Sequence, residues 1–137
     1  MNEESSRTKN VYLYKKGEGG KFCVGPPWDV DAWSFGTYGL KVFWAKDNSL
    51  YFNLLFKDPV FINRVKEKWD RYKKVWSEQI PKYIDEQYNK IHRSAKRNEM
   101  IWPDWIVPSS SYEQSVQEMK ETYITQLNWM DEQIKNL

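Results

Sequence analysis

Apolar residues recur at three- and four-residue steps along most of the chain after residue 57, which is the spacing of one face of an α-helix. Asp58 and Pro59 suit the N-cap and the first position of a helix that begins there. Pro81 predicts a break or kink, after which a second helix continues with the same period. The apolar stripe of the two stretches comprises Phe61, Val65, Trp69, Tyr72, Trp76 and Ile80, then Ile84, Tyr88, Ile91, Ala95 and Trp102.

A last long helix is predicted to run to the C-terminus. Ser110, with Glu113 three residues later, has the spacing of a capping box, and residues 97–107 ahead of it are interpreted as a packed connector. Trp129 lies off the apolar stripe of this helix. The stripe comprises Tyr112, Val116, Met119, Tyr123, Leu127, Met130, Ile134 and Leu137.

The N-terminal part has a different pattern. Residues 11–14 and 21–24 are rich in strand formers and enclose the glycine-rich sequence 17–20, which predicts a β-hairpin. The prolines of Gly25-Pro26-Pro27 predict the end of strand pairing. Residues 32–48 show no sustained period and are interpreted as an ordered loop held by aromatic side chains.

The predicted fold class is therefore mainly α with a small β-hairpin (α+β). Residues 1–137 are interpreted as a single domain or fragment with three parts. These are a hairpin over residues 10–25, a connecting segment over 26–48 and a helical part over 49–137, in which a short helix from 49 to 56 precedes the long ones.

Charge and composition exclude several functions. The net charge of +2 is too small to indicate a nucleic-acid partner. Twelve Lys and Arg against six Asp and Glu lie between Lys57 and Arg97, but the aromatic residues there follow helical spacing, which favours core aromatics beneath a solvated basic face.

No apolar run approaches the ~20 residues that span a bilayer. A single cysteine, Cys23, excludes an internal disulfide, and His92 has no second His or Cys at ligand spacing.

Candidate chemistry is concentrated just after the hairpin. Asp29 and Asp31 alternate in a stretch stiffened by proline, so in an extended segment both carboxylates would share one face while Trp28 and Val30 are buried on the other. Magnesium is held by one or two carboxylates together with substrate phosphate oxygens. The pair is therefore a candidate nucleotide-metal site, with ordinary solvated acids as the alternative.

Several motifs resemble, in order, the CotH (spore-coat protein H) kinase-like family. The most specific is the run from Gly25 to Asp31, Gly-Pro-Pro-Trp-Asp-Val-Asp, after a hairpin. The family commonly has an aromatic or larger aliphatic residue where Val30 stands. The other motifs are residues 9–15, 20–22, 58–61 and 65–69, Asn98 with Trp102-Pro103, and Leu127-Asn128-Trp129-Met130-Asp131.

The resemblance implies an atypical protein kinase that transfers phosphate from ATP to Ser or Thr of secreted or coat proteins. It assigns metal binding, with Mg or Mn and ATP, and hence the catalytic role, to Asp29 and Asp31. The nucleotide-gripping lysine and catalytic loop of the family precede the hairpin, so residues 1–137 correspond to the C-terminal part of the kinase-like lobe. We therefore expect this segment alone to be inactive.

The resemblance also implies a protein substrate and a location in the cell envelope, spore coat or outside the cell. If upstream residues normally cover the hairpin and the loop, the isolated chain should self-associate through the exposed apolar surface. The alternative function is a non-catalytic binding module at a cell surface. In that case Trp33, Tyr38 and Trp44 of the loop would engage sugar or protein.

Overall fold

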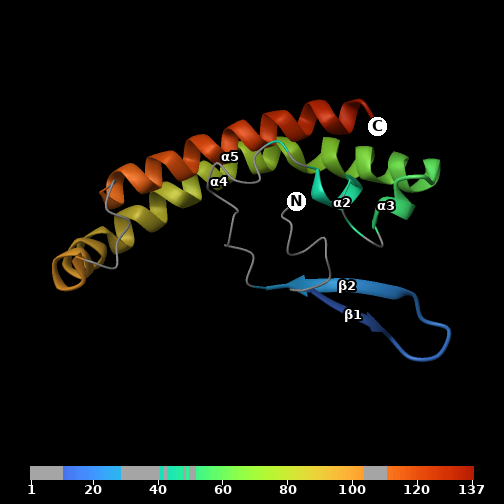
Figure 1. Ribbon diagram of the computed structural model, residues 1–137, viewed down its shortest axis with the longest axis horizontal. Coiled ribbons are helices and arrows are strands. Elements are labelled where there is room, and N and C mark those ends of the chain that lie inside the picture. Colours follow the sequence, from blue (N-terminus) through green and yellow to red (C-terminus); the bar gives the residue numbers. More distant parts are fainter. Residues whose placement is uncertain (1–10, 29–40, 42, 48, 50–51, 104–110) are drawn as a thin grey trace.

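The computed structural model describes residues 11–28, 41, 43–47, 49, 52–103 and 111–137. In chain order the elements are β1 (Val11–Lys15), β2 (Phe22–Pro27), α2 (Trp44–Asp47), α3 (Phe52–Leu55), α4 (Pro59–Ile101) and α5 (Tyr112–Lys135). The two long helices, α4 and α5, lie side by side, and the hairpin stands apart from them (Figure 1). The predicted class, mainly α with a small β-hairpin, is confirmed.

The hairpin pairs β1 with β2 in antiparallel register, with Leu13 opposite Val24 and Tyr14 opposite Cys23. The prediction that pairing ends before the prolines is wrong, because Val11 is still paired with Pro27. A two-stranded sheet has only edge strands, and an edge strand tolerates proline because one row of its N–H groups needs no partner. The register is irregular between Val11 and Leu13, opposite the prolines.

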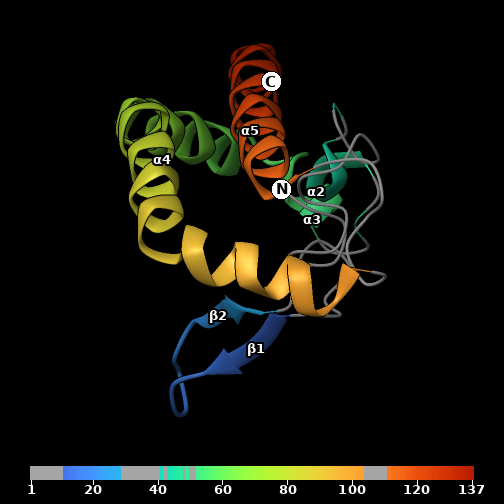
Figure 2. The same ribbon diagram turned by 90° about the vertical axis from the view of Figure 1, so that its left-hand side faces the viewer.

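Helix α4 is one continuous helix of 43 residues, so the expected division into two helices at Pro81 is wrong. Pro81 occupies an interior position of this helix. Figure 2 shows that the helix axis bends through the middle of α4, as a proline in a helix interior favours. The predicted start is confirmed, since the side chain of Asp58 accepts a 2.8 Å hydrogen bond from the backbone N–H of Val60. The helix extends to Ile101, so the first part of the expected connector is helical.

Helix α5 starts one residue later than expected. Its N-cap is Ser111, which forms a capping box with Gln114 in place of the expected Ser110 and Glu113. Both pairs have the required spacing. Contacts with α4 favour the later one, because the backbone N–H of Tyr112 donates a 2.8 Å hydrogen bond to Glu99 and the carboxylate of Glu113 lies 2.7 Å from Lys96.

The apolar core lies where the start of α4, the end of α5 and the short helices meet. Buried hydrophobic residues among those described are Phe43, Ala45, Met130 and Ile134. Partly buried residues packed against them are Phe52, Phe56, Val65, Trp69, Trp129 and Leu137. Trp129, expected off the stripe, therefore contributes to the core. Among the described helices, none combines the length and apolar character needed to cross a bilayer.

Candidate functional site

The two candidate aspartates, Asp29 and Asp31, lie outside the described residues. The structure describes the chain up to Trp28, which directly follows β2. The Trp28 ring lies against the ring of Tyr12 in β1, with centroids 4.4 Å apart and planes at 30°. The expectation that Trp28 is buried is wrong, because 41% of this residue is exposed and the hairpin alone offers too little surface to cover an indole. The hairpin thus holds the residue that immediately precedes the candidate site.

The aromatic loop of the alternative function is only partly described. Trp33 and Tyr38 lie outside the described residues, and Trp44 begins the short helix α2, within the segment expected to be a loop. Next to it, Phe43 is buried and meets Phe56 edge to face, with ring centroids 5.2 Å apart. The described end of this segment therefore packs on the core, as expected of an aromatic-rich segment that is ordered.

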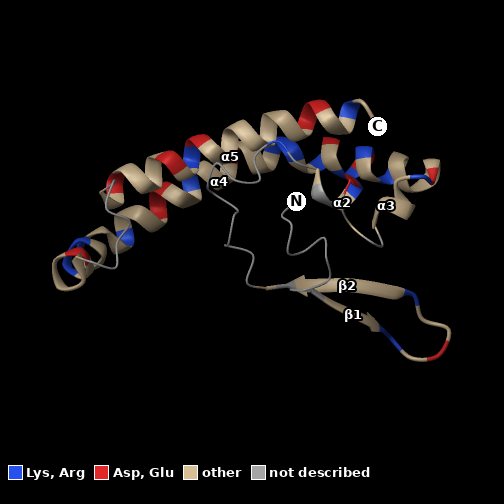
Figure 3. Ribbon diagram, in the orientation of Figure 1, with Lys and Arg blue, Asp and Glu red and all other residues tan. Residues whose placement is uncertain are grey.

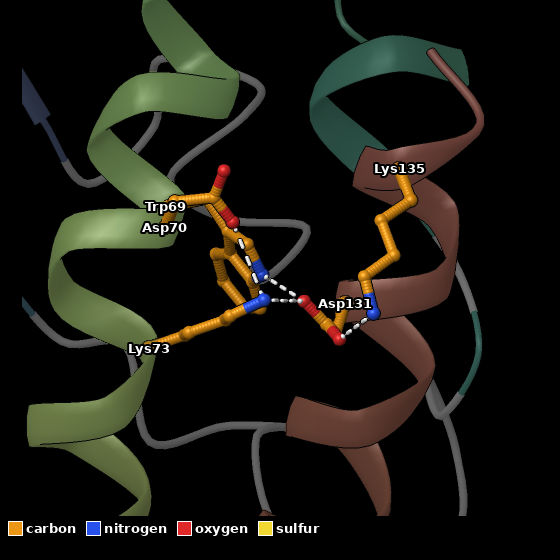
Figure 4. Close-up of polar contacts among 5 residues, drawn as sticks. All are labelled: Trp69, Asp70, Lys73, Asp131 and Lys135. Carbon is orange, nitrogen blue, oxygen red and sulfur yellow. Dashed lines mark hydrogen bonds and ion pairs between the residues drawn. The ribbon is translucent and has the colours of Figure 1, made fainter.

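A polar cluster lies next to the apolar core, between α4 and α5 (Figure 4). Asp131 of α5 lies at its centre, and its Oδ1 accepts hydrogen bonds from the indole N–H of Trp69, at 2.7 Å, and from Lys73 Nζ, at 2.9 Å. Its Oδ2 accepts from Lys135 Nζ at 2.5 Å. Asp70 lies 3.3 Å from the same Lys73 ammonium. Both oxygens of one carboxylate are thus occupied by donors from two helices.

These donors fix the charge of Asp131. The hydrogen bond from Lys135, together with those from Lys73 and Trp69, holds the pKa of the Asp131 carboxyl well below its usual range, although partial burial acts in the opposite direction. The hydrogen bond to Asp131 raises the pKa of Lys73. A carboxylate that stays ionised well into the acidic range and whose oxygens are already bonded is unsuited to general base catalysis. The cluster therefore fastens α5 to α4.

A second group of contacts fastens the other end of the helix pair. The rings of Tyr88 and Tyr112 stack with centroids 5.6 Å apart, and Lys120 Nζ lies 2.6 Å from Asp85 Oδ1. The ion pair with Lys96 lowers the pKa of Glu113, while burial raises the pKa of the Tyr112 hydroxyl. These contacts position the first turns of α5 against α4.

Within the described ranges, no group of three or more His, Cys, Asp or Glu side chains could hold a metal ion. His92 is half-buried, stacks on Tyr88 and places Nδ1 3.1 Å from the carbonyl oxygen of Asn89, as an ordinary structural histidine does. Cys23 is half-buried in β2.

Sequence reasoning did not identify the role of Asp131. A signal was present: Asp131 follows Met130 of the apolar stripe, and an acid beside a buried position needs a donor. Nothing in the sequence indicated that the donors would be Trp69 and Lys73, because they are about sixty positions away. The pairing depends on how α4 and α5 align.

Comparison with known proteins identifies one family. The family model described as CotH kinase protein matches residues 5–130, which include the hairpin, both aspartates and almost all of the helix pair. No curated protein and no solved structure matches the sequence. Since the match covers most of the chain, the protein belongs to the CotH kinase protein family.

Proposed function

We propose that this chain supplies the metal-binding aspartates and the helical base of an atypical protein kinase that transfers phosphate from ATP to Ser or Thr of secreted or coat proteins. The observation that carries the proposal is the family match over residues 5–130, which includes the Trp-Asp-Val-Asp segment. In this role Asp29 and Asp31 bind Mg²⁺ or Mn²⁺ together with the ATP phosphates.

The chemistry of the donor set fits such a metal. Two carboxylates two residues apart supply hard oxygen ligands, and magnesium completes its shell with water and phosphate oxygens. Two neighbouring carboxylates also repel each other until a cation lies between them. The hairpin supports the proposal because β2 ends at Pro27, and Trp28, lying against Tyr12, leads directly into Asp29.

Phosphate transfer needs more than a metal. It depends on positioning and electrostatic stabilisation by several separate parts, including a lysine that grips the nucleotide and a residue that orients the hydroxyl. In the family these precede the hairpin. We therefore propose that residues 1–137 bind metal and nucleotide weakly by themselves and transfer no phosphate.

A metal titration tests the proposed site directly. Mn²⁺ binding to residues 1–137, followed by electron paramagnetic resonance with and without ATP, should be weak and should tighten when ATP shares the ion. Asp29→Asn and Asp31→Asn should each reduce binding. Asp47→Asn is the matched control, because Asp47 is an exposed acid in α2 with no ion pair among the described residues. Equal binding by all four proteins would remove the aspartates from the proposal.

The catalytic part of the proposal needs the kinase-like lobe with its upstream elements. In that protein Asp29→Asn or Asp31→Asn should abolish transfer of radiolabelled phosphate to a Ser/Thr protein substrate, with circular dichroism to show that the fold is kept. Undiminished transfer by both variants would favour the alternative, a non-catalytic binding module. Binding of glycans by loop tryptophans without any response to magnesium and ATP would support that module.

We also propose that the isolated chain self-associates through the hairpin. Large apolar residues on both of its faces are exposed, namely Tyr12, Leu13, Tyr14, Phe22 and Val24. A two-stranded hairpin is at best marginally stable in water without a third strand or a covering element. Contiguous exposed apolar surface of this kind favours association.

A further inference from the structure

Basic residues recur along one face of α4, interrupted by two neutral positions and one acidic position. The row, called the basic ridge here, contains ten residues at three- or four-residue steps, and all ten are exposed. Seven of them are Lys or Arg and one is acidic. The ridge comprises Arg64, Lys68, Arg71, Val75, Gln79, Lys82, Glu86, Lys90, Arg93 and Arg97. At a rise of 1.5 Å per residue, it extends for about 50 Å. Figure 3 shows Lys and Arg at intervals along the length of α4.

The described contacts that hold α4 to α5 do not use the ridge. The basic residues of α4 that reach α5 are different ones, since Lys73 pairs with Asp131 and Lys96 pairs with Glu113. None of the seven ridge cations forms an ion pair with another described residue. The ammonium of Lys68 lies 6.0 Å from the centre of the Tyr72 ring, one turn further along the helix.

The cations of the basic ridge repel one another within the chain. Like charges three or four residues apart on a helix repel, as do Arg64 with Lys68 and Arg93 with Arg97. The sequence contains 19 acidic residues, yet only Glu86 lies on the ridge. No ion pair among the described residues offsets this repulsion, and Glu67, Glu78 and Glu86, three or four residues from ridge cations, offset it only in part. A bound anionic partner would offset it.

We propose that the basic ridge is a docking surface for an acidic segment of another protein, with carboxylates at matching three- and four-residue steps along a helix. Helix pairs select partners by such rows of complementary charges. The position of Glu86 favours a polypeptide. Lying between Lys82 and Lys90, it would repel a continuous row of phosphates, whereas a polypeptide can place a Lys or Arg opposite it.

Two other anionic partners fit the ridge less well. A membrane surface calls for apolar residues that insert beside the charges, and Val75 is the one aliphatic residue on the ridge. Single-stranded nucleic acid calls for aromatic rings free to stack on bases. Tyr72, beside the ridge, is already stacked on Trp76 at a centroid distance of 5.8 Å, and the exposed Tyr83 next to Lys82 is a single ring, whereas successive bases need several. The proposal concerns recognition alone and stands whether or not phosphate is transferred.

A peptide-binding experiment tests whether the ridge is a docking surface. A labelled helical peptide with Glu at three- and four-residue steps is titrated with the protein at low salt, and binding is followed by fluorescence anisotropy. The combined change Arg71→Gln, Lys90→Gln and Arg93→Gln should weaken binding by about tenfold, because exposed ion pairs contribute modestly and add up. Glutamine keeps the helix. The control is Lys15→Gln, Lys16→Gln and Lys21→Gln, which makes the same change of charge on exposed hairpin lysines and should leave binding unchanged. Equal losses in the two variants would overturn the proposal.

Glu86 gives a test of register. The wild-type chain should bind more tightly to a peptide with one Lys at the position opposite Glu86 than to the all-Glu peptide. Glu86→Lys should reverse that order. Circular dichroism checks the helix in each variant. The proposal is overturned if both proteins bind the two peptides with equal affinity. It is also overturned if the wild-type chain binds single-stranded DNA or anionic vesicles more tightly than either peptide.

Discussion

The indole N–H of Trp69 donates a 2.7 Å hydrogen bond to Oδ1 of Asp131, joining two side chains that are 62 positions apart in the sequence. Lys73 shares that oxygen, and Lys135 bonds the other one. One partly buried carboxylate thus satisfies donors from both long helices, next to the apolar core. The stability of the helix pair should depend on its charge.

Asp131→Asn keeps the shape of this side chain and removes its charge. The new amide N–H₂ would also face an ammonium that needs an acceptor. We expect a loss of about 1.5–3 kcal/mol in the free energy of unfolding, the range for hydrogen bonds to charged groups. Urea denaturation followed by tryptophan fluorescence measures it. Glu132→Gln, at an exposed neighbouring acid, is the control, and equal costs for the two changes would contradict the role of Asp131.

The same carboxylate predicts a dependence on pH. The pKa of Asp131 is lower in the folded chain than the value of about 3.9 expected when unfolded, so on acidification the unfolded state takes up the proton first. Its stabilisation is present above about pH 5 and is lost progressively as the pH falls. The difference in unfolding free energy between wild type and Asp131→Asn should therefore shrink between pH 6 and pH 3. A difference that stays constant over this range would refute the assignment.

Two tryptophans packed against the core should differ in their contributions. Trp69→Ala loses both apolar contacts and the bond to Asp131, with an expected cost of about 3 kcal/mol, the lower end for truncating a buried tryptophan. Trp129→Ala loses apolar contacts only and should cost less. Denaturant unfolding under matched conditions measures the loss of unfolding free energy in each variant. Trp69→Phe keeps an aromatic ring but removes the N–H donor, so it separates the two contributions of Trp69. Equal costs for the two alanine variants would show that the hydrogen bond adds nothing.

Pro81 should be replaceable with a gain in helix stability. A proline in a helix interior removes a backbone hydrogen bond and costs about 3 kcal/mol relative to alanine. Pro81→Ala should raise the melting temperature and the helical circular dichroism signal. Gln79→Ala, two residues earlier in α4 at an exposed position, controls for the general effect of alanine. A lower melting temperature for Pro81→Ala would mean that the bend of α4 is needed to pack α5.

Association through the hairpin can be tested by polar substitution. Phe22, 79% exposed, and Val24 lie on β2 and can both be changed to Thr, which keeps strand propensity. Light scattering over a concentration series should show dimers or larger species for wild type and a smaller mean mass for the double variant. Leu54→Thr, at an exposed position in α3, should associate like wild type. A wild-type chain that stays monomeric at high concentration would contradict the proposal.

Local signals in the sequence predicted local structure well. The glycine-rich turn between strand formers gave the hairpin, and Asp58 with Pro59 gave the start of α4, because each depends on interactions within a few residues. The stripe of α5 likewise includes its two buried residues, Met130 and Ile134. Family resemblance, confirmed by the match over residues 5–130, came from the order of several such short motifs.

The errors arose where distant contacts decide between local options. Ser110 and Ser111 both begin a valid capping box, and Glu99 of α4 selects the second by accepting a hydrogen bond from Tyr112. Pro81 disfavours helix locally, yet helix on both sides carries α4 through it. Asp29 and Asp31 lie outside the described residues, so their predicted role as metal ligands stays a prediction.

Burial is distributed unevenly along α5, and this has a dynamic consequence. Met130 and Ile134, the two buried residues of α5, lie in its last turns, whereas its first turns rest on a stacked Tyr88–Tyr112 pair and an exposed ion pair. Local opening starts where few apolar contacts must be broken. Backbone amides after Ser111 should therefore exchange with solvent deuterium first, and those around Met130 last. Helix α5 would then detach from α4 progressively from its first turn, with its C-terminal turns as the anchor.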